Sequence, residues 1–156
     1  MGETRVIRLL VVEDNGAYLY LIQRAFQARQ GEIRWELTVA EDGEQAIKIL
    51  FAEEEESAPL PDLILLDWNL PKVNGSEVLQ RIKGHTRLRR IPVLVFSASE
   101  ADTDMHTAYD YYANGYIKKP DDPDMLGAIV ETIERFWIAV AQLPKVARSG
   151  HVPTKS

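Results

Sequence analysis

The hydrophobic positions of this chain form short apolar runs separated by longer stretches of helical period. The runs predict strands at Val6–Val12, Arg34–Val39, Asp62–Leu66, Pro92–Phe96 and Gly115–Ile117. The stretches between and after them predict helices at Gly16–Arg29, Gly43–Glu55, Ser76–Gly84, Ala101–Tyr112 and Pro123–Leu143. Strands that alternate with helices in this way are typical of βα units, whose parallel strands build one sheet.

The runs differ in how deeply they are expected to be buried. The first, third and fourth are continuously apolar, as in strands covered on both faces, whereas Trp35, Leu37 and Val39 alternate with polar residues in a less buried second strand. Five such units predict a flavodoxin-like, doubly wound α/β fold, (βα)5, with a parallel sheet of order 2-1-3-4-5 and an extended C-terminal helix. We expect one domain over residues 4–143 and a mobile polar tail over 144–156. The first helix should turn an apolar stripe to the core: Tyr18, Leu21, Ile22, Ala25 and Phe26.

Reactive side chains stand where the predicted strands end. Glu13 and Asp14 follow the first strand, Asp67 follows the third, Ser97 the fourth, and Lys119 comes just after the fifth. The ligand crevice of a doubly wound sheet lies at the carboxyl ends of strands one and three. Each residue alone could be an ordinary cap or surface group, and Ser99 competes with Ser97, but together they predict a site.

This set of groups suits phosphoryl transfer. Clustered carboxylates raise one another's pKa unless a cation is near, and oxygen donors without Cys or His suit Mg²⁺. Beside Mg²⁺, the Asp67 carboxylate is a plausible nucleophile toward phosphorus, and Lys119 would offset charge on the transferring oxygens. Ser97 could donate a hydrogen bond to one of them. The product would be an aspartyl phosphate.

The same residues resemble the receiver domains of bacterial two-component response regulators. The matching segments, in the family's order, are Leu10–Asn15, Asp62–Pro71 with Gly75, Ile91–Ala98 and Gly115–Pro120. The resemblance implies that Asp67 accepts phosphate from a histidine kinase. The Mg²⁺ ligands that it implies are Asp14, Asp67, the main-chain carbonyl of Asn69 and, through water, Glu13.

The resemblance also implies roles on the neighbouring strands. Ser97 would be the switch hydroxyl, Tyr116 the aromatic residue whose rotamer reports the state, and Lys119 the phosphate partner. The Lys119–Pro120 bond is often cis in the family. Two departures, Glu13 where Asp is commoner and Ser97 where Thr is commoner, keep the chemistry.

Finer features resemble one subgroup, the single-domain regulators that serve phytochrome-type light-sensing kinases. These features are the lengthened stretch around Glu53–Pro61, the turn Trp68–Pro71, and the ending Ile133–Trp137 followed by Leu143–Pro144. The partner would then be a bacterial phytochrome, and the output would be altered protein–protein contacts.

Composition narrows the class further. A net charge of −6 argues against a nucleic-acid partner. The absence of cysteine suits a reducing cytoplasm. No apolar segment is long enough for a signal peptide or a bilayer span, so we expect a cytoplasmic protein without membrane contact.

Two surfaces are candidate interfaces. The predicted last helix is longer than the crossover of a βα unit requires. Its C-terminal half, Phe136–Ala141, is apolar on more than one face. This predicts a homodimer through the C-terminal helix, the alternative being a helix that folds back on its own domain. Leu19 and Tyr20, off the core stripe, are a candidate docking spot for the kinase or else incidental surface residues.

Three rival functions remain. A phosphatase with a strand-end Asp nucleophile needs a second acid two residues later, where this chain has Asn69, so we expect no turnover enzyme. A degenerate receiver that only binds partners would lack a member of the site, and none is missing. A flavin or dinucleotide module is disfavoured because Glu13–Gly16 replaces a Gly-rich loop.

Overall fold

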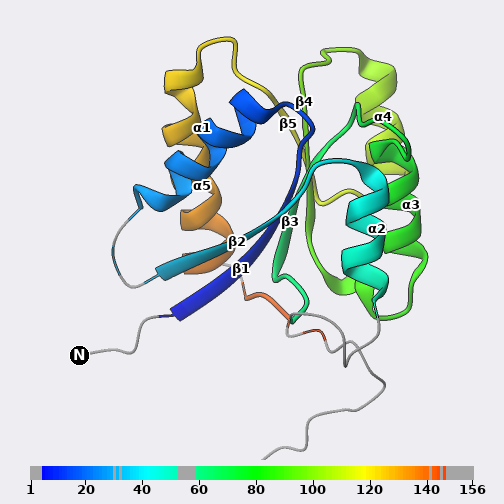
Figure 1. Ribbon diagram of the computed structural model, residues 1–156, viewed down its shortest axis with the longest axis horizontal. Helices are drawn as coiled ribbons and strands as arrows, with labels where there is room; N and C mark the ends of the chain where they lie inside the picture. The colour runs from blue at the N-terminus through cyan, green and yellow to red at the C-terminus, as the bar shows by residue number, and fades with distance from the viewer. Residues whose placement is uncertain are drawn as a thin grey trace, which may run out of the picture.

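One twisted parallel sheet forms the centre of the molecule. The computed structural model describes residues 5–29, 31, 33–52, 59–140, 142–144 and 146. Within them the strands are β1 (Arg5–Val12), β2 (Ile33–Ala40), β3 (Leu63–Asp67), β4 (Val93–Ser97) and β5 (Gly115–Lys118). Their order is β2-β1-β3-β4-β5, and every pair is parallel, as predicted (Figure 1).

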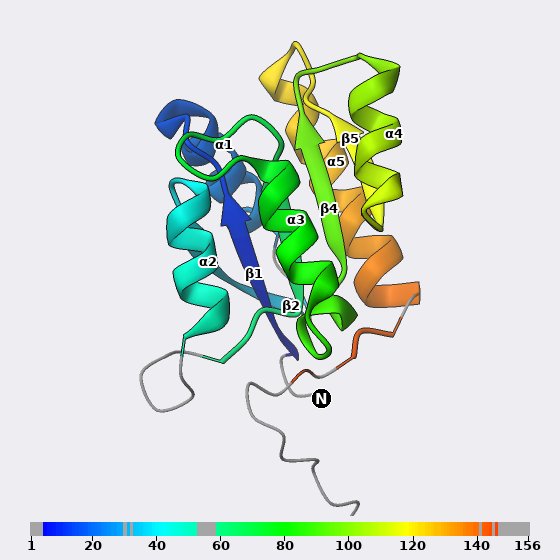
Figure 2. The ribbon, with the colours of Figure 1, turned by 90° about the vertical axis from the view of Figure 1, so that its right-hand side faces the viewer.

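Helices cover both faces of the sheet. They are α1 (Gly16–Gln27), α2 (Gly43–Phe51), α3 (Gly75–Gly84), α4 (Asp102–Asp110) and α5 (Leu126–Ile133), with short 3₁₀ turns η2 (Leu88–Arg90) and η3 (Pro123–Met125). Helices α1 and α5 lie on one face, and α2, α3 and α4 lie side by side on the other (Figures 1 and 2). This is the doubly wound arrangement that the alternating pattern predicted.

Successive residues of the central strands enter opposite cores because side chains alternate across a strand. The core beneath α1 and α5 receives Leu9, Val11, Leu63, Leu65, Leu94 and Phe96. The core beneath α2, α3 and α4 receives Leu10, Val12, Ile64, Leu66, Val93 and Val95. Both faces of β1, β3 and β4 are therefore apolar, which explains their continuous hydrophobic runs. The edge strand β2 is mostly half-buried, as its alternation predicted.

Side-chain caps set where several helices begin. Asn15 accepts a hydrogen bond from the amide of Tyr18 at the start of α1, and Asp42 accepts one from Gln45 at the start of α2. Asp122 accepts one from the Asp124 amide, and Pro123 occupies the first turn of η3, where its missing N–H costs nothing. The observed helices are mostly a few residues shorter than predicted, and α2 ends at Phe51, whereas the prediction ran to Glu55.

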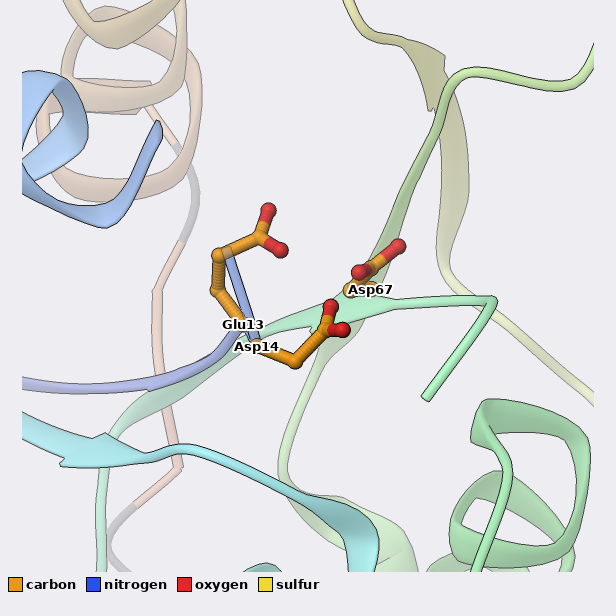
Figure 3. Close-up of side chains that lie close together, drawn as sticks. All are labelled: Glu13, Asp14 and Asp67. Atoms are coloured by element: carbon orange, nitrogen blue, oxygen red, sulfur yellow. The ribbon is translucent and has the colours of Figure 1, made fainter. Parts of the chain in front are cut away.

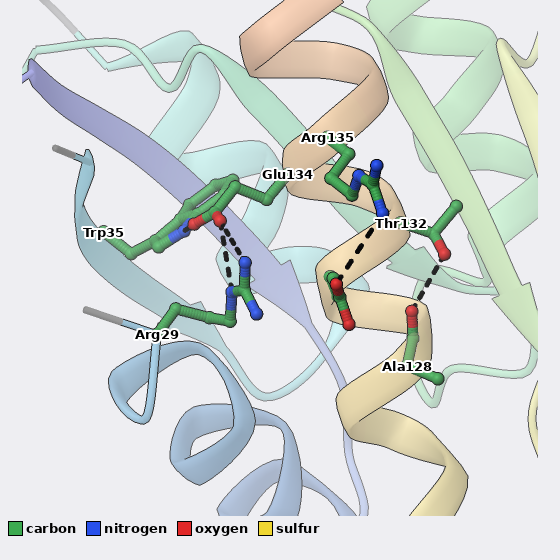
Figure 4. A network of polar contacts seen from close by, with 7 residues as sticks. Arg29, Trp35, Ala128, Thr132, Glu134 and Arg135 are labelled. Carbon is green, nitrogen blue, oxygen red and sulfur yellow. Dashed lines mark hydrogen bonds and ion pairs between the residues drawn. The ribbon is translucent and has the colours of Figure 1, made fainter. Parts of the chain in front are cut away.

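The C-terminal helix continues past α5 but changes form. Residues Glu134–Val140 (η4) make a π-helix, and residues 142–144 are irregular, so the predicted end at Leu143 was too late. Figure 4 shows how this segment is attached: Glu134 accepts hydrogen bonds from Arg29 and from the Trp35 indole. Arg5 also donates to the Ile138 carbonyl at 3.0 Å. The extension is thus attached to the segment just after α1, to β2 and to β1.

Some predictions fall wholly or partly outside the described residues. The acidic run Glu53–Glu56 does, as does most of the expected tail, although Val146 is half-buried against the core. The domain boundaries therefore stay predictions. Among the described helices, none has both the length and the apolar character needed to cross a membrane.

Candidate functional site

The acidic residues meet at one edge of the sheet, at the ends of β1 and β3. The register pairs Val12 with Leu66, so the next residues, Glu13 and Asp67, leave the sheet as neighbours. Figure 3 shows the carboxylates of Glu13, Asp14 and Asp67 turned toward a common space. One oxygen from each lies within 4.8 Å of the others. Glu13 and Asp67 are buried, and Asp14 is exposed.

Crowding and burial perturb the central carboxylate. Burial raises the pKa of Asp67 well above its usual value, and the adjacent Glu13 and Asp14 raise it further, whereas Lys119 lowers it. A buried carboxylate beside two others resists ionisation because like charges at short range repel strongly. A cation at this point would favour the charged form.

Lys119 supplies the positive charge of the site. Its amide donates to the Ser97 carbonyl at 2.7 Å, which fixes the chain as it leaves β5. Its ammonium lies 2.6 Å from Glu13 Oε1 and 3.5 Å from Asp67 Oδ1. The described residues contain no cis peptide bond, so the Lys119–Pro120 bond is trans here, unlike the form often found in the family.

The donor set fits a hard divalent cation. All three candidate ligands are carboxylates, and among the described residues the ammonium of Lys119 alone lies within ion-pair distance of the cluster, so negative groups outnumber positive ones. Oxygen-only donors of this kind suit Mg²⁺ or Mn²⁺. Glu13, Asp14 and Asp67 are the residues that would hold the ion.

The loop after Asp67 is tightly built around that residue. The Asn69 amide donates to Asp67 Oδ1 at 3.4 Å. A Cβ at Gly75 would lie 2.5 Å from the Asp67 carbonyl oxygen and 2.8 Å from Trp68 Cα, so only glycine fits there. The use of the Asn69 main-chain carbonyl as a metal ligand stays a prediction.

Ser97 and Tyr116 are linked through Ser99. Ser97 is fully buried at the end of β4, and its hydroxyl accepts from the Ser99 amide at 3.1 Å. The Tyr116 hydroxyl donates to the Ser99 carbonyl at 3.0 Å. The Ser99 hydroxyl donates to the Asp104 carboxylate at 2.6 Å at the start of α4 and accepts from the Ala101 amide at 3.1 Å, so Ser99 is held at that end of the helix. The switch roles of Ser97 and Tyr116 stay predictions.

Two aromatic residues of the site were not predicted. Tyr18, assigned to the core stripe of α1, lies with its ring centre 4.8 Å from the Lys119 ammonium. Phe96, on β4, packs against Tyr18 with ring centres 5.8 Å apart and lies 5.9 Å from the same ammonium. Both residues stand at positions whose apolar pattern predicts core packing. The sequence feature that could have placed Tyr18 at the site is its spacing, about one helical turn after Asp14.

The predicted docking pair is only half exposed. Tyr20 is 57% exposed on α1, but Leu19 is half-buried and packs against the core beneath α1 and α5. The prediction of an exposed pair is therefore wrong for Leu19, and Tyr20 remains as a surface residue.

Comparison with known proteins places most of the chain in one group. A model of the response regulator receiver domain matches residues 9–131. Response regulator Rcp1 of Synechocystis is 39% identical over 137 residues, covering 87% of this chain and 92% of the relative. A probable methanogenesis regulatory protein, FilR2 of Methanothrix harundinacea, is 41% identical over 138 residues, covering 87% and 86%.

Solved structures agree with these relatives. The Mn²⁺-bound form of Rcp1 superposes with a TM-score of 0.81 at 38% identity, covering 88% of this chain and 99% of the other. A phosphorylated cyanobacterial phytochrome response regulator, RcpA, gives 0.82 at 42% identity, covering 88% and 98%.

Proposed function

This chain belongs to the response regulator receiver domain family of two-component signalling, and from that membership we propose that a histidine kinase phosphorylates it on Asp67. One observation carries the proposal. The Asp67 carboxylate lies beside two further carboxylates, with the Lys119 ammonium 3.5 Å from its Oδ1. Nucleophile, counter-charge and metal donors therefore meet at one point.

In the proposed reaction, an Asp67 oxygen bonds to phosphorus as the phosphorus–nitrogen bond of a phosphohistidine breaks. The electron pair of the broken bond returns to the donor imidazole. Lys119 offsets charge on the transferring oxygens, and Ser97 offers a hydroxyl at the neighbouring strand end. When bound, Mg²⁺ would neutralise the acidic cluster and keep Asp67 ionised.

The phosphate should then persist as a signal. The residue two positions after Asp67 is Asn69. Its main-chain N–H can orient the Asp67 carboxylate, but its side chain offers no carboxylate to activate water. We therefore propose that the protein turns over no free phosphoester and loses its phosphate slowly.

The partner that we propose is a phytochrome-type kinase. Support comes from the similarity to RcpA, a phytochrome response regulator, over nearly the whole of that chain. The finer subgroup features of the sequence point to the same class. Tyr20, exposed near the start of α1, is the residue that we expect to contact the kinase.

We also propose a homodimer through the face formed by α4, β5 and the C-terminal helix. Two open apolar grooves of about 280 and 240 Å³ adjoin there and share Ile117, Thr132 and Ile133. Phe136 is 53% exposed beside them, whereas Ile138 is buried, so the extension partly folds back on its own domain. A second copy of the chain would cover the apolar remainder.

Labelling with acetyl phosphate and Mg²⁺ tests the central proposal. The wild type should gain one alkali-labile phosphoryl group, seen by mass spectrometry, and Asp67→Asn should gain none. Asp62→Asn is a matched control because Asp62 is equally buried at the other end of β3, and asparagine keeps an acceptor for the Arg8 amide. Equal labelling of wild type and Asp67→Asn would overturn the proposal.

A further inference from the structure

Tyr18 stands at the first turn of α1 because of the cap that precedes it. The Asn15 side chain accepts a hydrogen bond from the Tyr18 amide at 3.0 Å, which starts the helix directly after the acidic pair Glu13 and Asp14. Helical side chains lean toward the N-terminus of their helix. The ring of Tyr18 is thus carried back toward the acidic site.

The ring meets the ammonium of Lys119, which pairs with the carboxylates of the site. Lys119 Nζ lies 4.8 Å from the Tyr18 ring centre, and its side chain is only 14% exposed. A cation over an aromatic face is attracted by the ring's electron density, more strongly where water is excluded. Phe96, 2% exposed, supports the Tyr18 ring from the β4 side.

The hydroxyl of Tyr18 has a different character from its ring. It is buried, and it has no hydrogen-bond partner among the described residues. Burial, with a smaller effect of Glu13, raises the pKa of Tyr18 to about 12, so the phenol is neutral near neutral pH. A buried hydroxyl without a partner does not stabilise the fold. The ring, and not the hydroxyl, is therefore the part of Tyr18 that contacts Lys119.

The Glu13 and Asp67 carboxylates attract the Lys119 ammonium fully only while they bind no metal ion and carry no phosphoryl group. Glu13, at 2.6 Å, and Asp67, at 3.5 Å, attract it through charge. A divalent cation in the cluster would cancel much of that attraction, and phosphorylation would consume an oxygen of Asp67. The attraction of a ring does not depend on either event.

We propose that Tyr18 is a positioning residue whose ring face holds the Lys119 ammonium at the phosphoacceptor site. This inference rests on the proposed phosphorylation of Asp67, which it deepens by adding a residue outside the acidic cluster. The ring face, and not the hydroxyl, is the part assigned to the role.

Three variants at position 18 separate ring, hydroxyl and shape. Tyr18→Phe keeps the ring and removes the hydroxyl. Tyr18→Leu removes the ring. Pentafluorophenylalanine at position 18 keeps the shape of a ring but reverses the charge distribution of its face, so it should repel the ammonium. It keeps the test decisive if the Leu variant unfolds, which circular dichroism would reveal.

The first readout is the position of Lys119 in metal-free, unphosphorylated protein. Ring currents should shift the Lys119 ε-methylene proton resonances upfield in wild type and Tyr18→Phe, and the shift should shrink in Tyr18→Leu. The second readout is the rate of labelling by acetyl phosphate with Mg²⁺. We expect Tyr18→Phe to match wild type and the Leu and pentafluoro variants to be about tenfold slower, as for a partly desolvated cation–ring contact.

The possible results test the role of Tyr18 separately from the proposed phosphorylation of Asp67. Failure of wild type to label would overturn the proposed function itself. Wild-type labelling together with equal rates in all three variants would overturn only the role of Tyr18. Loss of rate in Tyr18→Phe as large as in Tyr18→Leu would also overturn it, because the hydroxyl would then be responsible.

Discussion

The attachment of the C-terminal extension through Glu134 gives the sharpest stability prediction. The Glu134 carboxylate accepts hydrogen bonds from Arg29 Nε at 3.1 Å, Arg29 Nη2 at 2.5 Å and Trp35 Nε1 at 2.9 Å (Figure 4). Its side chain is 15% exposed and that of Arg29 is 32% exposed. Glu134→Ala would remove all three acceptor contacts.

The expected cost follows from the geometry. A hydrogen bond to a charged group contributes roughly 1.5–3 kcal/mol, but these three are not additive, and water can replace part of what a third-exposed Arg29 loses. We expect Glu134→Ala to cost about 2 kcal/mol, which lowers Tm by roughly 4–8 °C for a chain of this size. Glu134→Gln keeps an acceptor for Trp35 and should cost about 1 kcal/mol.

Urea denaturation monitored by circular dichroism measures these changes, and Glu131→Ala is the matched control. Glu131 lies on α5, 49% exposed, and pairs with Arg135 at 3.9 Å. An exposed pair of this kind is worth about 0.5 kcal/mol or less. If Glu134→Ala costs no more than Glu131→Ala, the extension is not held by this network and the reasoning is refuted.

The same network predicts a pH dependence. Burial raises the pKa of Glu134, but hydrogen bonds from Arg29 and Trp35 outweigh it, so the folded pKa lies below the usual 4.5. A depressed carboxyl pKa gives stability that is full above the unfolded pKa and is lost as pH falls through the folded one. Wild type should therefore lose stability relative to Glu134→Gln as pH falls below about 5, whereas an unchanged difference would contradict the assigned pKa direction.

Three further predictions concern the site and the surfaces. Asp14→Asn should weaken Mg²⁺ binding by about tenfold or more, measured by calorimetry, because it removes one charge from the donor set; unchanged affinity would exclude Asp14 as a ligand. Gly75→Ala should cost about 1–3 kcal/mol in urea because its Cβ would meet the Asp67 carbonyl at 2.5 Å, and a neutral result would show that the loop yields. Phe136→Glu should shift a dimer toward monomer in sedimentation without slowing acetyl phosphate labelling. Tyr20→Glu is the matched control, because Tyr20 is 57% exposed and Phe136 is 53% exposed. It should leave both the dimer and acetyl phosphate labelling unchanged, but it should slow phosphoryl transfer from a cognate kinase.

Much of the fold could be predicted from pattern alone because each strand and helix carries its own local signal. Continuous apolar runs gave β1, β3 and β4, and the alternation in β2 gave an edge strand. Helix ends were less accurate. Nothing in the sequence marked the change from α-helix to π-helix at Glu134, where the observed backbone hydrogen-bonding pattern changes.

The acidic part of the site was accessible for a topological reason. In a doubly wound sheet, residues that end strands one and three emerge next to each other, so the sequence alone is enough to group Glu13, Asp14 and Asp67. The structure confirms the grouping, with oxygens of all three within 4.8 Å of one another. Lys119, just after the end of β5, completed the group by the same logic.

The contact between Tyr18 and Lys119 could not be predicted from strand ends and periodicity. The spacing of Tyr18 marks it as a core residue of α1, and its ring does pack against Phe96, yet the same ring also lies over the Lys119 ammonium. The network of Arg29, Trp35 and Glu134 likewise joins residues about 100 positions apart. The sequence by itself determined the fold class and the acidic edge, because periodicity and strand ends are local properties. Only the tertiary structure decided which aromatic ring faces the lysine and which cation holds the last helix, because those contacts depend on side-chain direction and distance across separate elements.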